Sequence, residues 1–419
     1  MSISRKLLIG YIFSFPLINA LSPRPWIPLS FALALLAIPL QLLTKSKNPI
    51  RISNSDIHFL LILGLGIMPI LPSANSGQQN YLYSAAWVAI VIVEFVFVRM
   101  WIVRSGLTFD DISRVSRKAI TFLSCAIVFE FITANIYGIY LSDLIPFNIS
   151  EFPDADMLNN FKRPRGFSAE AGFTAVVYET LVPISLYRFN RFMQVKVSYL
   201  LLAVTGYLLL GSGASLISTS LAILLYLLAE TQVKLKSILI LIVAALIGIG
   251  FLQIIEGYDV LYEVIGRKVE ALFFGQIDDE NPSTHVSRNY VYNQMLSIIA
   301  NYPLGIGWGM LSQLYHSNVL LHNIDPILSR GAISLFLEIT VSAGVFGGLI
   351  FIRLVANTIK NLFTRKGKPE KLLLISLTAV SIHHIAILEL SMPMFWFILA
   401  LATVVIEQTP SSKQENPGK

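Results

Sequence analysis

The segment VSYLLLAVTGYLLLGSGASLISTSLAILLYLLAE, residues 197–230, decides the fold class of this chain. It holds two apolar runs, 197–211 and 214–230, which are joined at Gly211-Ser212-Gly213. Each run approaches the roughly 17–25 residues that a helix needs to cross a bilayer. An open strand cannot cross lipid, because its backbone groups would be left unpaired. We therefore predict two transmembrane helices connected by a tight turn.

The composition of the whole chain supports the same fold class. Hydrophobic residues make up 55% of the 419 residues and charged residues only 13%, a balance too apolar for a soluble domain. The apolar residues fall into about twelve runs, at about 7–21, 25–43, 57–73, 81–101, 119–145, 170–187, 197–211, 214–230, 237–254, 331–355, 372–388 and 392–407. We predict an all-α polytopic membrane protein, with residues 1–407 as one integral helical domain and 408–419 as a disordered cytoplasmic tail.

The lysines and arginines between the runs predict the orientation in the membrane, because cytoplasmic loops carry an excess of them. With the N-terminus inside, the inner loops hold roughly 22 basic residues and the outer loops about eight, so both termini are predicted to be cytoplasmic. This placement accounts for the net charge of +6 without a nucleic-acid partner. Two outer loops are long, at about 146–169 and about 255–330, the second between the ninth and tenth helices. An amphipathic stretch at 104–118 is predicted to lie along the inner surface.

About eight basic residues remain outside against this bias, and they suggest an anion site on the outer face. They are Arg24, Lys162, Arg163, Arg165, Arg267, Lys268, Arg288 and Arg330. The alternative is that they contact lipid headgroups or neighbouring carboxylates.

Arg288 is the strongest member of this set. A helix is predicted from a cap at Ser283 or Thr284 to about Asn301. Arg288 shares one face of that helix with Val291, Tyr292, Met295 and Ile299. A solvated arginine would lie on the opposite face, and the helix N-terminus favours anions. We therefore expect Arg288 to face the bundle at an anion site.

Candidate proton acceptors lie in the same two outer loops. Glu170 follows Arg165 at the start of a predicted span and could act as a general base or orient the arginine, or simply form a structural pair with it. His316 and His322 close the second outer loop, where an imidazole could accept a hydroxyl proton near neutral pH.

Other polar residues fall inside the predicted spans. His383-His384 are expected to be packed or hydrogen-bonded residues of the bundle. Four intramembrane carboxylates are each either functional or structurally hydrogen-bonded, because a buried charge is costly: Glu94, Glu130, Glu179 and Glu338. No histidine pair has zinc-ligand spacing with a third ligand, so no metal is predicted. The glycines at 305, 307 and 309 are expected to form a turn and not a nucleotide-binding loop.

Two stretches carry a resemblance to a known family. The stretch Arg165-Gly-Phe-Ser-Ala-Glu170 resembles the Arg-x-Gly-x-x-x-Glu stretch of bacterial polysaccharide polymerases. Arg288, followed by YVYNQMLSIIANYPLGIGWG and then by His322-Asn323, resembles the large-loop pattern of the O-antigen polymerase and ligase superfamily.

This resemblance implies an enzyme of the bacterial inner membrane whose active site faces the periplasm. The donor would be a glycan on undecaprenyl diphosphate, transferred without a metal or other cofactor. Arg165 and Arg288 would hold the diphosphate, and His322 or Glu170, with His316 as an alternative, would deprotonate the acceptor. Further substrate contacts would come from Arg163, Arg267, Lys268, His316 and Asn323.

Three functions remain open at this point. The first is a polymerase that joins lipid-linked repeat units, with a chain-length regulator as a possible partner. The second is an O-antigen ligase that transfers the glycan to lipid A–core. The third is a lipid-linked oligosaccharide flippase, which would also have about twelve spans but usually shows repeat symmetry and short loops.

Overall fold

The computed structural model describes residues 3–17, 20, 28–43, 53–67, 88–144, 157–158, 161–168, 170–187, 193–229, 288–311, 334–386 and 392–408. The longer helices are α1 (Ile3–Phe13), α2 (Leu29–Leu43), α3 (Asn54–Ile67), α5 (Val98–Ser105), α6 (Phe109–Tyr137), α8 (Ala171–Ser185), α9 (Met193–Leu209), α10 (Gly213–Ala229), α14 (Arg288–Asn301), α16 (Leu335–Thr364), α17 (Lys368–Ala386) and α18 (Pro393–Gln408). Short elements are the 3-10 turn η1 (Phe15–Leu17), the π-helical segment η4 (Val93–Phe97), α7 (Leu141–Leu144), and an antiparallel pair of two-residue strands, β1 (Met157–Leu158) and β2 (Phe161–Lys162).

The helices form a bundle around α18. Nearly every residue from Pro393 to Val404 is buried, as expected for a helix that is apolar on all sides. Aromatic rings fill the space around it: Trp396 packs edge-on against Phe59 and Phe395, and Phe397 packs against Phe15. The core therefore lies between helices from both ends of the chain.

Large apolar side chains are exposed on the outside of the bundle, notably on α3, α6, α9, α10 and α16. An apolar outer surface over an apolar core is what lipid contact requires, since lipid is the solvent for that surface. By length and composition, α6 and α16 could each cross a membrane. Among the described residues, six further apolar helices are shorter.

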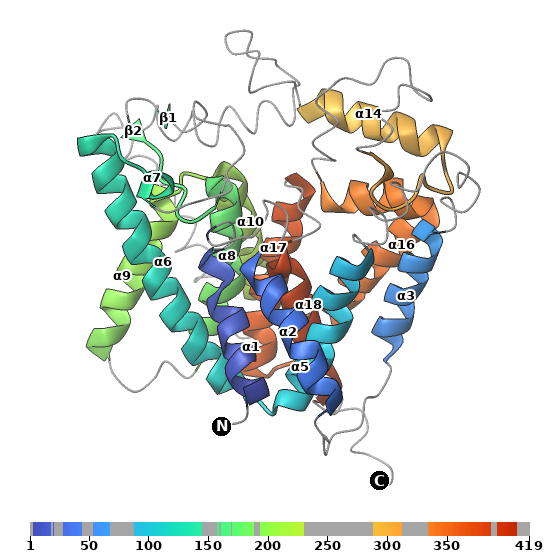
Figure 1. Ribbon diagram of the computed structural model, residues 1–419, viewed down its shortest axis with the longest axis horizontal. Coiled ribbons are helices and arrows are strands. Elements are labelled where there is room, and N and C mark those ends of the chain that lie inside the picture. The colour runs from blue at the N-terminus through green and yellow to red at the C-terminus, as the bar shows by residue number, and fades with distance from the viewer. Residues whose placement is uncertain are drawn as a thin grey trace.

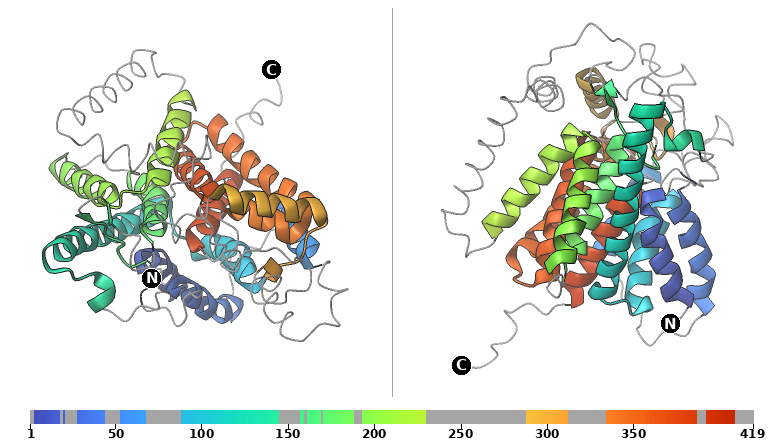
Figure 2. Two further views of the ribbon diagram at one scale, coloured as in Figure 1. Left: turned by 90° about the horizontal axis from the view of Figure 1, so that it is seen from above. Right: turned by 90° about the vertical axis from the view of Figure 1, so that its left-hand side faces the viewer.

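Helix α1 begins and α18 ends at one end of the bundle, and α7, β1, β2 and α14 lie at the other (Figure 1). Figure 2, seen from above, shows α14 crossing that far end over the α16 side of the bundle. We refer to the end with α7 and α14 as the distal end.

The predicted helical class is confirmed. Within the described residues, each predicted apolar run overlaps a helix, and the run at 237–254 lies outside them. The number of membrane crossings and their orientation stay predictions.

The structure corrects the prediction for 104–118. Gly106 takes a left-handed conformation, and α6 then begins at a capping box formed by Thr108 and Asp111. The helix continues without a break to Tyr137, so the amphipathic stretch and the following predicted span are one helix.

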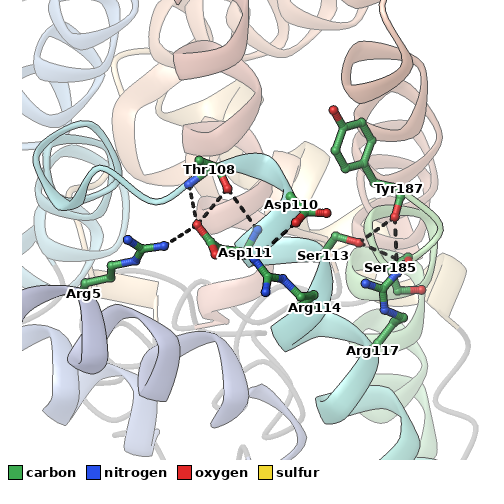
Figure 3. Close-up of polar contacts among 9 residues, drawn as sticks. All are labelled: Arg5, Thr108, Asp110, Asp111, Ser113, Arg114, Arg117, Ser185 and Tyr187. Atoms are coloured by element: carbon green, nitrogen blue, oxygen red, sulfur yellow. Dashed lines mark hydrogen bonds and ion pairs between the residues drawn. The ribbon is translucent and has the colours of Figure 1, made fainter. Parts of the chain in front are cut away.

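Polar contacts within the bundle explain why this stretch is not a separate surface helix (Figure 3). The Asp111 carboxylate pairs with Arg5 of α1 at 2.5 Å, and Arg117 donates to the carbonyl oxygens of Ser185 and Tyr187 at the end of α8 at 3.0 and 3.2 Å. The polar face of early α6 is thus paired with neighbouring helices.

Candidate functional site

The arginine loop, which we define as residues 162–168, lies at the distal end between β2 and α8. Arg165 is 8% exposed, and the centre of its guanidinium lies 5.5 Å from the centroid of the Tyr140 ring. The Lys162 ammonium lies 5.8 Å from the centroid of the same ring. Two cations are therefore held against one aromatic ring, close to the end of α6.

Glu130 of α6 holds the backbone of this loop. Its Oε2 accepts hydrogen bonds from the backbone N–H groups of Arg165 at 3.0 Å and Gly166 at 2.6 Å. Its Oε1 accepts from the N–H of Leu141 at 3.3 Å. Asn135, one turn further along α6, exchanges two hydrogen bonds with the backbone of Lys162, at 2.7 and 2.9 Å. Glu130 is thus structurally hydrogen-bonded, one of the two roles that the sequence left open.

The carbonyl side of Arg165 is fixed as well. Its oxygen accepts from Ser168 Oγ at 3.1 Å and from Thr174 Oγ1 at 2.5 Å. Gly166 has a φ of 67°, which favours glycine, and the Phe167 ring stacks on Phe122 with centroids 5.4 Å apart. Arg165 is therefore presented by a backbone that is fixed on both sides, as a preorganised binding group requires.

Arg163 lies in the arginine loop, and Glu170 lies just after it at the start of α8. Arg163 Nε donates to the carbonyl oxygen of Leu210 in the turn between α9 and α10. Burial lowers the pKa of Arg163 to about 10, and the negative charge of Glu170 opposes this shift. Glu170 is exposed and forms the N-cap residue of α8 without a side-chain capping bond. The structure therefore places Glu170, directly after the loop that carries Arg165, close enough to Arg163 for its charge to act on that arginine.

Helix α14 begins at Arg288 and ends at Asn301, where the sequence predicted its end. The side chain of Arg288 lies outside the part of the chain that the structure describes. On the predicted inward face Met295 is fully buried, and Tyr292 Oη donates to the carbonyl oxygen of Ile385 in α17 at 2.5 Å. Tyr292 and Met295, two residues of that predicted face, are therefore turned toward the bundle.

A break in α16 anchors the segment that follows α14. Gly344 interrupts α16 with φ 74° and ψ 177°. Ile306 and Gly307 donate backbone hydrogen bonds to the carbonyl oxygens of residues 341 and 342 at 2.9 and 3.0 Å. The N–H of residue 345 donates to the Pro303 carbonyl at 2.9 Å. The predicted span at 331–355 therefore contains a kinked helix.

Two glycines meet at this break. A Cβ atom on Gly305 would lie 2.5 Å from the backbone nitrogen of Gly344, and one on Gly344 would lie 2.5 Å from the backbone carbon of Leu304. The turn expected at the three glycines is confirmed, and its role is to dock the α14 segment onto α16. Trp308 then packs against Gly66 of α3 and donates to the Leu63 carbonyl at 3.1 Å.

The remaining predicted site residues are not tested by the geometry. Arg267, Lys268, His316, His322 and Asn323 lie outside the described residues. Within the described ranges, no group of three or more His, Cys, Asp or Glu side chains could hold a metal ion.

The histidines of the predicted eleventh span are buried and hydrogen-bonded, as expected. His383 Nδ1 lies 2.8 Å from Glu179 Oε2, and His384 Nδ1 lies 2.8 Å from the Val380 carbonyl oxygen. Among the intramembrane carboxylates, Glu94 accepts from Tyr11 Oη at 2.6 Å.

Sequence reasoning missed two residues that support the arginine loop, Asn135 and Tyr140. It named Glu130 but could not name its partners. A polar and an aromatic residue near the end of a long apolar run, just before a basic loop, are the signal that could have drawn attention to them.

The fold and this loop define a class: a helical membrane protein with a fixed cationic loop at the distal end. Residues 198–352 match the family model described as O-antigen ligase, which confirms the resemblance of this chain to the O-antigen ligase and polymerase superfamily. The matched region runs from α9 into α16 and includes Arg288, whereas the arginine loop precedes it. A search of curated proteins gave no match.

The family match supports a membrane enzyme of glycan transfer in lipopolysaccharide or polysaccharide synthesis, with lipid-linked glycans as its substrates.

Proposed function

We propose that this protein is an O-antigen-type polysaccharide polymerase that joins undecaprenyl-diphosphate-linked repeat units at the periplasmic face of the bacterial inner membrane. The observation that carries the proposal is the position of the Glu130-anchored arginine loop at the same end of the bundle as α14, which begins at Arg288. Cations from two separate elements at one end suit a diphosphate, which presents negative charge on both of its phosphoryl groups.

In the proposed reaction, a hydroxyl of the acceptor repeat unit attacks the anomeric carbon of the donor glycan. The bond from that carbon to the diphosphate oxygen breaks, and undecaprenyl diphosphate leaves with the bonding electrons. Arg165 and Arg288 stabilise the charge that develops on the leaving group, a task that does not require a metal. The proton of the hydroxyl passes to His322 or Glu170, with His316 as the alternative.

The remaining predicted residues would act as substrate contacts. Arg163, beside Glu170, would contact phosphate or sugar, as would Arg267, Lys268, His316 and Asn323 in the second outer loop. The polypeptide would cross the membrane about twelve times with both termini in the cytoplasm, which places the distal end in the periplasm. A separate protein would set the chain length.

An O-antigen ligase is the second candidate, favoured by the description of the matched family. It would use the same arginines on the same donor and pass the glycan to lipid A–core instead of to another lipid-linked repeat unit.

Deletion of the gene, followed by a surface-polysaccharide gel, tests the proposal. A polymerase predicts that material with a single repeat unit persists while the ladder of longer chains disappears. Loss of all repeat units from the acceptor, with long lipid-linked chains accumulating on the outer face, would favour the ligase. Complementation with Arg288→Ala should not restore the ladder although the protein is made, and a normal ladder from that variant would overturn the diphosphate assignment.

A further inference from the structure

A buried polar triad lies in the bundle away from the proposed reacting groups. Ser218 Oγ donates to Glu179 Oε1 at 2.5 Å, and His383 Nδ1 lies 2.8 Å from Glu179 Oε2. All three side chains are shielded from solvent. Both oxygens of the Glu179 carboxylate therefore have polar partners, which lowers the free-energy cost of burying this carboxylate.

The three residues come from three helices that pack on one another: Glu179 from α8, Ser218 from α10 and His383 from α17. A second polar contact, from Ser376 Oγ to the Thr180 carbonyl at 3.0 Å, also joins α8 to α17 but does not include α10. The triad thus joins all three helices at a single point.

The distal ends of these same helices hold the two parts of the proposed site. Helix α8 begins directly after Glu170 and the arginine loop. Helix α10 follows the turn in which the Leu210 carbonyl accepts from Arg163. Helix α17 ends beside Ile385, whose carbonyl accepts from Tyr292 of α14, one helical turn after Arg288.

We propose that Glu179, Ser218 and His383 are positioning residues that fix the separation between the arginine loop and α14. This inference rests on the proposed function, because it assumes that the arginine loop and α14 bind one diphosphate. Two cations on different elements can share a diphosphate only at a fixed distance, and a displacement of about 1 Å can cost about 100-fold in rate.

The first test compares Glu179→Ala with Glu179→Gln. Alanine removes both contacts, and we expect kcat on the lipid-linked donor to fall by roughly 100-fold. Glutamine keeps an oxygen that accepts from His383, and its amide can donate to Ser218 Oγ, so it should restore most of kcat. A glutamine variant as inactive as the alanine variant would overturn the positioning role, because the negative charge and not the geometry would then be required.

The second readout is a distance that does not depend on activity. Spin labels are placed at Leu208, which is 56% exposed and lies two residues before the Leu210 carbonyl that accepts from Arg163, and at Leu296 of α14, which is 55% exposed. They report the separation between the contact of the arginine loop and α14. Cys125→Ser removes the single native cysteine, so that only the introduced sites are labelled. We expect the same narrow distance distribution for the wild type and for Glu179→Gln, and a broad or shifted one for Glu179→Ala. An unchanged distribution in the alanine variant would overturn the proposal.

Asp56→Asn is the matched control. Asp56 forms a buried ion pair with Arg99 at 2.7 Å between α3 and α5, and it does not belong to α8, α10 or α17. It should lower stability without changing the distance between the labels. If Glu179→Ala does not fold, Ser218→Ala removes only one of the two contacts to Glu179 and should broaden the distribution to a smaller extent.

The two proposals fail in different ways. If Arg165→Ala or Arg288→Ala keeps normal turnover, the diphosphate assignment fails and this inference fails with it, whatever the label distances are. If those variants are inactive but Glu179→Ala keeps normal turnover and a narrow distribution, only the positioning role is overturned.

Discussion

Glu130 accepts a hydrogen bond of 3.0 Å from the backbone nitrogen of Arg165, although the two residues are 35 positions apart in the sequence. A buried carboxylate in α6 thereby fixes the loop that carries the candidate diphosphate-binding arginine. Within the described residues, the carboxylate accepts three hydrogen bonds, from the backbone N–H groups of residues 141, 165 and 166.

Glu130→Gln should weaken this anchor. The amide nitrogen cannot accept a hydrogen bond, so at least one buried N–H loses its partner at a cost of about 1–3 kcal/mol. We expect a lower unfolding temperature of the purified protein and reduced glycan transfer. Thr121→Ala on the same helix is the control, because Thr121 is exposed and bonds only to the Arg117 carbonyl of its own helix. Equal unfolding temperatures for Glu130→Gln and wild type would contradict the anchoring role.

Arg165→Ala should reduce glycan transfer by about 100- to 1,000-fold, the loss typical when one group that stabilises a developing negative charge is removed. Arg165→Lys should fall between alanine and wild type, since lysine keeps the charge but not the planar fork of donors. The control is Arg114→Ala, which removes an exposed arginine paired with Asp110 and Asp111 near the start of α6, whereas the arginine loop contacts Asn135 near the end of that helix. Equal losses in the Arg165 and Arg114 variants would mean that the effect is not local.

Arg163→Gln should reduce glycan transfer without lowering the unfolding temperature. Burial lowers the pKa of Arg163 to about 10, so the folded state disfavours its charge. At pH 7 the group is charged in both the folded and the unfolded protein, and this penalty is therefore fully present. Removing the charge should leave the unfolding temperature unchanged or higher while glycan transfer falls. A clear drop in the unfolding temperature would show that Arg163 is held mainly for stability.

Gly344→Ala should disrupt the backbone contact between α16 and the segment that follows α14. The added Cβ would approach the backbone of Leu304 to 2.5 Å at a positive φ, and strain of this kind costs about 1–3 kcal/mol. We expect a lower unfolding temperature together with a loss of transfer. Gly64→Ala in α3 is the matched control, because its Cβ would meet nothing within 4 Å. A tolerated alanine at Gly344 would contradict the backbone junction between the α14 segment and α16.

Cysteine labelling tests the proposed orientation. In a Cys125→Ser background, Leu144→Cys at the distal end should react with a membrane-impermeant reagent in spheroplasts. Lys366→Cys, in the turn between α16 and α17, should react only after the membrane is permeabilised. Both positions are exposed in the fold. Labelling of both cysteines from one side would overturn the predicted topology.

Much of the architecture follows from the sequence because lipid restricts the chain so strongly. An apolar run that crosses a membrane must satisfy its backbone hydrogen bonds internally, so runs such as 197–211 and 392–407 could be assigned as helices without any tertiary information. The end of α14 at Asn301 was equally predictable, because proline and glycine follow it. The sequence also marked Arg163, Arg165 and Glu170 as one cluster, since they are close along the chain.

Only the tertiary structure decided which residues meet across the bundle. The partners of Glu130 and Glu179 lie 35 and 204 residues away, at Arg165 and His383, and hydrophobic periodicity carries no information on such pairings. The break at Gly344 was hidden for the same reason: the local sequence of α16 is compatible with a continuous helix, and the segment that occupies the break comes from residues 303–307. The sequence by itself determined that this protein consists of apolar helices suited to lipid. Packing between distant segments determined how its arginine loop is held.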